Sequence, residues 1–234
     1  MHVSDRLQIL AVNDDGIHAP GLKALVEALR ELGDVEVVAP LVEQSGMSHR
    51  ITYLHPIMVR EIKDERGDRY GWAVDGSPAD CVKLGILEFC PRPPDLIVSG
   101  INSGANVGIN VIYSGTVAAA IEGAFFGITS IAVSLAQGTP PDYAAAAARA
   151  IPLIQQLRDR HSQAGTLWNI NFPDTTAAGP KGIRVCSMGV KRHTDTCEKR
   201  IDPRGRAYYW TGIDPLKNHE LEPGGDVHEL QSGY

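Results

Sequence analysis

LQILAVNDDG, residues 7–16, joins a short apolar run to two adjacent carboxylates. The run Leu7–Val12 has the length and the almost continuous apolar character of a strand buried on both faces of a parallel sheet. Asp14 and Asp15 follow this run directly, so they should lie at the carboxyl end of the strand. Open α/β sheets bind their ligands at that edge. The ten residues therefore predict a parallel α/β fold with a polar site beside its first strand.

A helix and a second strand follow the two carboxylates. Ala19, Pro20 and Gly21 open a segment with the apolar spacing of a helix. Its apolar positions are Leu22, Leu25, Val26, Leu29 and Leu32. We expect Gly33 to cap this helix and residues 35–40 to form the next parallel strand. The polar loop that follows, residues 41–50, should then emerge on the same edge of the sheet as the carboxylates.

The middle of the chain predicts a hairpin and further elements of the same sheet. Residues 53–59 and 70–74 have the pattern of two strands on the surface, with the charged turn 63–68 between them. Further strands are expected at residues 94–100, 128–135, 168–173 and 183–185, and helices at residues 117–126 and 143–157.

The pattern changes beyond residue 180. Turns are expected at residues 202–206 and 222–226, and a short aromatic strand at residues 207–210. We therefore divide the chain into an α/β core that carries the predicted site, residues 1–180 with a hairpin at about 51–74, and a strand-rich appendage, residues 181–234. The appendage is expected to serve oligomerisation and to shape the mouth of the pocket.

The paired carboxylates have two explanations. Two like charges a few Å apart stay ionised at neutral pH only where a cation or several hydrogen-bond donors offset their repulsion. A hard divalent metal with oxygen ligands is one such cation. Asn, Asp and Gly are also the commonest turn and helix-cap residues, so a capped turn at Asp14 and Asp15 is the alternative. The four residues NDDG alone do not decide between these two explanations.

A second polar stretch follows the strand predicted at residues 94–100. Residues 101–108 are rich in glycine and asparagine, which provide backbone freedom and exposed amide donors. Ser114, Gly115 and Thr116 then precede the predicted helix, and free N–H groups at a helix N-terminus attract phosphate. A simple N-cap role for Ser114 or Thr116 is the alternative, and it stays open on local grounds.

Structural roles account for several other polar residues. Ser77 and Asp80 resemble a capping box at the start of a helix, which we favour over contact with a ligand. Cys81 falls in the apolar pattern of that helix and is expected in the core. His18 lies near the carboxylates in sequence, but a solvated loop histidine is the expected reading, because oxygen-liganded metals do not need imidazole.

Composition argues against several classes of function. The chain has 234 residues, 43% of them hydrophobic, which is enough for a packed core. Its net charge of -6 argues against a nucleic-acid polymer as partner, because binding to phosphate backbones uses clustered lysine and arginine. Four widely spaced cysteines favour neither a zinc site nor a disulfide framework. With no signal-peptide pattern and no membrane-spanning apolar run, a cytoplasmic protein without membrane contact is expected.

Six segments, taken in order, resemble one known family. They are VNDDGIHAPG (12–21), QSG (44–46), GSPADCV (76–82), SGINSGANVG (99–108), YSGTVAAAIEG (113–123) and DPRGRAYYW (202–210). The chain is similar to the SurE survival-protein nucleotidases over most of its length. The resemblance implies a Rossmann-like, mostly parallel α/β sheet flanked by helices, with a protruding hairpin. It also implies assembly into a homodimer or homotetramer.

The resemblance further implies an activity and a site. The implied reaction is the divalent-metal-dependent hydrolysis of nucleoside 5′-monophosphates to nucleoside and phosphate, extended in some members to 3′-nucleotides and short polyphosphate. By position, the family's metal ligands fall on Asp14, Asp15, Ser45 and Asn102, and its phosphate-binding positions on Asn106, Ser114, Gly115 and Thr116. Four oxygen ligands with two charges suit one Mg²⁺ or Mn²⁺ per subunit better than Zn²⁺.

The mechanism and the class of protein leave alternatives. The attacking species is expected to be water activated by the metal, but Asp14 as general base or as nucleophile is also open. A non-catalytic nucleotide sensor is the rival class, because it would use the same phosphate loop. A haloacid-dehalogenase-like phosphatase would have Asp-x-Asp after the first strand, and a dinucleotide-binding protein would have Gly-x-Gly-x-x-Gly there. Neither pattern is present.

Two positions depart from the family. Ser77 stands where the family commonly has threonine, a change that keeps the hydroxyl. Members of the family usually continue beyond Gly233 and Tyr234 into a last strand. Lack of that strand would affect the assembly of subunits and leave the catalytic edge intact.

Overall fold

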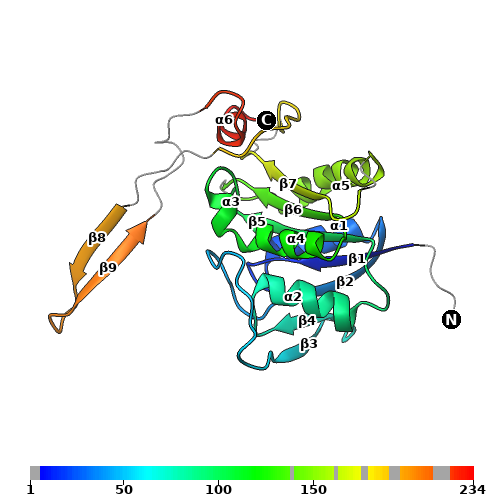
Figure 1. Cartoon of the computed structure of the whole chain (residues 1–234), viewed down its shortest axis with the longest axis horizontal. Helices are drawn as coiled ribbons and strands as arrows, with labels where there is room; N and C mark the ends of the chain where they lie inside the picture. Colours follow the sequence, from blue (N-terminus) through cyan, green and yellow to red (C-terminus); the bar gives the residue numbers. More distant parts are fainter. Residues whose placement is uncertain (1–5, 138–139, 161–162, 175–178, 190–195, 213–221) are drawn as a thin grey trace.

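The fold is built around one seven-stranded sheet (Figure 1). The structure, a computed structural model, describes residues 6–137, 140–160, 163–174, 179–189, 196–212 and 222–234. The strands of the sheet are β1 (Leu7–Val12), β2 (Gly33–Pro40), β3 (Val59–Lys63), β4 (Arg69–Val74), β5 (Leu96–Ser103), β6 (Ser130–Leu135) and β7 (Leu167–Phe172). They lie in the order β3-β4-β2-β1-β5-β6-β7. Neighbouring strands are parallel except for the antiparallel pair β3 and β4.

Helices cover both faces of this sheet (Figure 1). The helices of the described chain are α1 (Pro20–Leu29), α2 (Pro78–Leu84), α3 (Asn110–Tyr113), α4 (Gly115–Phe125), α5 (Tyr143–Arg160) and α6 (Asp226–Gln231), with a π-helical turn η1 (Gly85–Phe89) after α2. Strand β1 shows how the two layers form, because its side chains alternate between faces. Ile9 packs with residues of α1 and α5, and Leu10 packs with residues of α2 and α4. The predicted parallel α/β architecture is confirmed.

The turn between α1 and β2 differs from the prediction. Helix α1 ends at Leu29, and Arg30 is its C-cap. Gly33, which we expected as the cap, is the first residue of β2 and pairs with Leu7. A Cβ on Gly33 would collide with the carbonyl oxygen of Leu7, so glycine is required here by the close approach of two strands.

The predicted hairpin is present, but its first strand begins later in the chain. Strand β3 starts at Val59, so the prediction of a strand from residue 53 is wrong for residues 53–58. Strand β4 pairs in parallel with β2, and β3 forms the edge of the main sheet. Tyr53, at the start of the mispredicted stretch, is 77% exposed, in keeping with a loop on the surface.

Helix α2 starts with the predicted capping box. The hydroxyl oxygen of Ser77 accepts from the N–H of Asp80 at 3.1 Å, and the carboxylate of Asp80 accepts from the N–H of Ser77 at 2.9 Å. The same two side chains hold the preceding loop, since Ser77 donates to the carbonyl of Arg50 and Asp80 accepts from the N–H of Thr52. Cys81, next in the helix, is fully buried as predicted.

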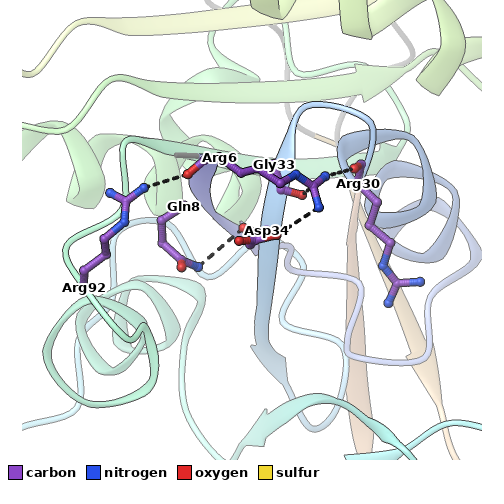
Figure 2. A network of polar contacts seen from close by, with 6 residues as sticks. All are labelled: Arg6, Gln8, Arg30, Gly33, Asp34 and Arg92. Carbon is purple, nitrogen blue, oxygen red and sulfur yellow. Dashed lines mark hydrogen bonds and ion pairs between the residues drawn. The ribbon is translucent and has the colours of Figure 1, made fainter. Parts of the chain in front are cut away.

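A polar network fastens the edge of the sheet opposite the carboxylates. Figure 2 shows the guanidinium of Arg6 between the end of α1 and the start of β2. It donates to the carbonyl of Arg30 at 2.6 Å and to the carboxylate of Asp34 at 3.0 Å. Arg92 in turn donates to the carbonyl of Arg6 at 2.9 Å (Figure 2). These bonds tie the amino ends of β1 and β2 together, while the carboxyl ends stay available for a site.

The C-terminal part contains a separate hairpin and a short helix. Strands β8 (Thr196–Ile201) and β9 (Ala207–Gly212) form a two-stranded antiparallel sheet that projects away from the main sheet (Figure 1). The predicted turn at residues 202–206 connects them. The strand predicted at residues 183–185 is wrong, and α6 was not predicted. Among the described residues, no helix is both long and apolar enough to span a membrane.

Candidate active site

The two carboxylates lie in a tight turn that Asn13 closes. Asn13 is fully buried, and its carboxamide donates to the carbonyl of Gly16 at 2.9 Å and accepts from the N–H of Gly16 at 3.2 Å. Gly16 has φ +100°, a conformation that favours glycine. The turn therefore exists as one explanation predicted, and Asn13 closes it. Asp14 and Asp15 are left as additional charged groups at the carboxyl end of β1.

Asp14 is buried against the start of α4. It is 3% exposed, and its Oδ1 accepts from the hydroxyl of Thr116 at 2.5 Å. A Cβ on Gly115 would lie 2.8 Å from Cβ of Asp14, so only glycine lets the helix terminus come this close. Burial raises the pKa of Asp14, and hydrogen bonds from Thr116 and from backbone groups, including Gly115, counter this in part.

Asp15 follows Asp14 in the turn and is exposed to the negative charges of Asp14 and Glu43. Its Oδ2 accepts from the N–H of Ser103 at 3.2 Å, at the end of β5. Burial, the charge of Asp14 and, least, the charge of Glu43 together raise the pKa of Asp15 to about 6, against the lowering by the Ser103 N–H. Both charges that act on Asp15 are thus negative. A bound cation would relieve this repulsion.

Ser45 belongs to a loop that is attached to Asp14. The N–H of Gln44, its neighbour, donates to the carbonyl of Asp14 at 2.7 Å. The Ser45 hydroxyl donates to the carboxylate of Glu43 at 2.6 Å. The lone pairs of the Ser45 oxygen can therefore coordinate a cation. Ser45 and Glu43 are both exposed. The predicted loop after β2 therefore reaches the edge where the two aspartates lie.

Asn102 lies near the carboxyl end of β5, and Asn106 lies in the loop that follows this strand. The amide nitrogen of Asn102 donates to the carbonyl of Gly104 at 2.8 Å, so its Oδ1 is the atom able to serve a metal. Asn102 is next to Ser103, which contacts Asp15. Asn106 is buried and is held by residues of β6 and β7.

Ser114 and Thr116 make local contacts at the N-terminus of α4. Ser114 is the N-cap, and its hydroxyl oxygen accepts from the N–H of Val117 at 3.2 Å. Its O–H stays available as a donor. The Thr116 hydroxyl is directed at Asp14 instead. The N-cap alternative is thus realised at Ser114, and a phosphate role for these residues stays a prediction.

The donor set suits a hard divalent cation. The turn after β1 offers two desolvated carboxylates, and the loop after β2 and the end of β5 offer the neutral oxygens of Ser45 and Asn102. Over the part of the chain that the structure describes, no group of three or more His, Cys, Asp or Glu side chains forms a metal site. A cation here would therefore combine the carboxylates with neutral oxygen ligands. His18 is exposed, as predicted for a loop histidine.

Sequence reasoning missed several residues that shape this edge. Asn13 closes the turn, Asn169 and Asn171 on β7 hold Asn106, and Asp226 on α6 binds the N–H of Gly108 at 2.8 Å. Asn169 and Asn171 did leave a signal, because two asparagines are unusual in a strand. Asp226 left none, since its partners are distant in sequence.

Comparison with known proteins identifies relatives along nearly the whole chain. The family described as survival protein SurE matches residues 9–195. The 5′-nucleotidase SurE of Rhodopirellula baltica is 52% identical over 205 residues, which cover 87% of this chain and 81% of the relative. That of Pelotomaculum thermopropionicum is 44% identical over 228 residues, covering 97% and 86%. The crystal structure of the SurE protein from Aquifex aeolicus superimposes with a TM-score of 0.81 at 38% identity, covering 97% of this chain and 90% of that one.

Proposed function

The chain belongs to the SurE survival-protein family, and we propose that it hydrolyses nucleoside 5′-monophosphates to nucleoside and phosphate with a divalent metal. One observation of the site carries the proposal. Asp14 and Asp15 are desolvated side by side at the carboxyl end of β1, next to the N-terminus of α4. A cation bound to this pair would attract the phosphate dianion that the carboxylates alone would repel.

The proposed metal ligands are Asp14, Asp15, Ser45 and Asn102, and they hold one Mg²⁺ or Mn²⁺. The set has only two negative charges, so one divalent cation would neutralise it and remove the repulsion that a phosphate would otherwise meet. When bound, the cation polarises the phosphoryl group and lowers the pKa of water.

Asp14 is the proposed catalytic carboxylate. The Thr116 hydroxyl and neighbouring backbone groups orient its carboxylate, which we propose takes a proton from attacking water. Direct attack by Asp14 on phosphorus is the alternative, and it uses the same carboxylate. Both routes require that Asp14 keeps its orientation against α4.

The phosphate is proposed to bind at the start of α4 and at Asn106. Ser114 donates through its O–H, Gly115 and Thr116 through the helix terminus, and Asn106 through the amide hydrogen that Ser134 does not use. Activity toward 3′-nucleotides and short polyphosphate is proposed as an extension at the same site.

Residues 181–234 are proposed to support assembly and the edge of the pocket. Tyr209 and Trp210 on β9 are 58% and 61% exposed, which suits a contact between copies of the chain in a homodimer or homotetramer. Asp226 on α6 reaches Gly108 in the loop that carries Asn106, which suits a role at the pocket edge.

The test is phosphate release from a panel of 5′- and 3′-nucleoside monophosphates and tripolyphosphate, with Mn²⁺, Mg²⁺ or EDTA. Release from 5′-nucleotides that requires a metal is the expected result. Nucleotide binding without release under every metal condition would contradict the proposal and favour a sensor. Release that persists undiminished in EDTA would contradict the metal site.

A further inference from the structure

We propose that Asn171, with support from Asn169, is a positioning residue that fixes Asn106 for phosphate binding. The inference rests on the proposed function, in which Asn106 donates to the phosphate. It concerns two residues of β7 that the metal and phosphate assignments leave out.

The side chain of Asn171 binds both the N–H and the carbonyl of Asn106, and we call this pair of bonds the clamp. The Oδ1 of Asn171 accepts from the N–H of Asn106 at 2.8 Å, and its Nδ2 donates to the carbonyl of Asn106 at 3.1 Å. Asn169 donates to the same carbonyl at 2.8 Å. A buried backbone group without a partner is costly, so these bonds determine where residue 106 lies.

The side chain of Asn106 is oriented from the next strand. Its Nδ2 donates to the hydroxyl of Ser134 on β6 at 2.8 Å. Since Asn106 is 7% exposed and its backbone is clamped, the second amide hydrogen has one direction available. Two neighbouring strands thus hold one loop residue through four hydrogen bonds to three of its polar groups.

The sequence of β7 is divided between packing and this clamp. Trp168, Ile170 and Phe172 pack on the main core, while Asn169 and Asn171 alternate with them on the opposite face. Asparagine is a poor strand former, and an edge strand has no structural need for two of them. The loop between β5 and α3 is rich in glycine and has little rigidity of its own, so an external clamp gives it one conformation.

The consequence for binding is specific to phosphate. The proposed metal ligands lie in the turn after β1, on the loop after β2 and at the end of β5, and among the described residues no hydrogen bond joins any of them to Asn171. Loss of the clamp should therefore weaken phosphate binding and leave Mn²⁺ binding intact.

The experiment measures binding of inorganic phosphate and of Mn²⁺ by calorimetry, together with KM for AMP, for wild type, Asn171→Ala and Asn169→Ala. For Asn171→Ala we expect phosphate binding about tenfold weaker and KM raised to match, because the N–H of Asn106 loses its acceptor and the carbonyl of Asn106 keeps only the bond from Asn169. For Asn169→Ala, where Asn171 still donates to the carbonyl, we expect a smaller loss of about threefold. The dissociation constant of Mn²⁺ should not change in either variant.

Two controls separate positioning from general damage. Ile170→Ala removes core packing from the same strand and should lower the melting temperature without changing phosphate affinity. In an Asn106→Ala background, Asn171→Ala should cause no further loss, because the clamp acts through the Asn106 side chain. Additive losses in that double variant would overturn the proposal.

Other results also decide the question. Unchanged phosphate affinity in both asparagine variants, or a parallel loss of Mn²⁺ binding, would contradict a positioning role. Should Asn171→Ala fail to fold, Asn169→Ala carries the test. A wild type that binds phosphate but releases none from AMP would refute the proposed function and leave the clamp testable through phosphate binding alone.

Discussion

At the scale of single residues, the proposed active site at the carboxyl end of β1 brings negative charges close together. Asp14 and Asp15 are pressed together by the Asn13–Gly16 turn, and Glu43 adds a third negative charge nearby. A chain selected only for stability would not bury this pair. A bound cation would offset these charges. Without a cation, their repulsion lowers the free energy of unfolding of the protein.

This repulsion predicts how Asp15→Asn changes stability with pH. Because the folded pKa of Asp15 is raised from 3.8 to about 6, ionisation opposes folding. The contribution of protonated Asp15 to the free energy of unfolding is fully present below pH 4 and is lost as the pH rises through 6. In EDTA, Asp15→Asn should thus be more stable than wild type at pH 8, by about 1–2 kcal/mol once solvent screening is allowed for, and similar at pH 4. Urea unfolding at both pH values measures this, and equal stability at pH 8 would contradict it.

At the scale of elements, the start of α4 is a helix end fitted to a carboxylate. Gly115 leaves no room for a side chain, since its Cβ would meet Asp14 at 2.8 Å and Pro78 at 3.1 Å. The helix terminus thereby reaches Asp14, and Thr116 bonds to it. Because of this close contact, a shift of the start of α4 would also move the carboxylate of Asp14.

Gly115→Ala is predicted to displace Asp14. Activity with AMP should fall by about 100-fold or more, because the catalytic carboxylate moves, and the melting temperature should drop. The double variant with Asp14→Gly removes both clashing atoms of residue 14, Cβ and Oδ2, and should recover part of the lost melting temperature without recovering activity. Full activity of Gly115→Ala would contradict the geometry at this helix end.

Helix α6 is predicted to support the phosphate loop through one aspartate. Asp226 accepts from the N–H groups of Gly108 at 2.8 Å and Gly189 at 2.9 Å. Asp226→Ala should raise KM for AMP by about three- to tenfold and speed hydrogen exchange at Gly108, because both amides lose their acceptor. Glu222→Gln, an exposed neighbour, serves as the control and should behave as wild type. A change in kcat with an unchanged KM would refute the role.

The sequence predicts some of these elements well and others poorly, for physical reasons. The apolar runs of β1 and β6 identify themselves because both their faces are buried. Gly33 was misread because a cap and a close strand contact both require glycine. Residues 53–58 are rich in strand-forming aromatic and aliphatic side chains, yet Asp80 of the α2 capping box binds the N–H of Thr52, and the chain that follows it is a loop.

Some residues of the site could be placed from the sequence, and others could not. Asp14, Asp15 and the helix terminus at Gly115 could be placed on one edge, because parallel strands end together. The clamp on Asn106 could not, since Asn171 is 65 residues away along the chain. Contacts of this kind depend on the order of β6 and β7, which no local pattern contains.

At the scale of the whole molecule, two kinds of surface are kept apart. The main sheet carries the proposed active edge, and the hairpin of β8 and β9 projects away from it with exposed aromatic residues (Figure 1). Between the strands, Lys199 lies over the ring of Tyr209 at 6.0 Å. Catalysis and assembly are therefore expected to be separable by mutation.

The double variant Tyr209→Ser, Trp210→Ser is predicted to dissociate the assembly. Removing two exposed aromatic rings takes away the apolar contact area that would hold the copies together. Light scattering coupled to size exclusion should show a dimer or tetramer for wild type and a smaller species for the variant. Tyr53→Ser, at 77% exposure on another surface, is the matched control. A monomeric wild type or an unchanged variant would contradict the assignment.

The central claim is that Asp14 and Asp15 hold a divalent metal and that Asp14 does chemistry on a phosphate. The most direct measurement is phosphate release from AMP by wild type and Asp14→Asn, each with Mn²⁺ or EDTA, with Asp64→Asn in the β3–β4 turn as the matched aspartate control. The account predicts release that EDTA abolishes, a fall of about 100-fold or more for Asp14→Asn in a folded protein, and wild-type release for Asp64→Asn. Metal-dependent release that survives in Asp14→Asn would contradict it.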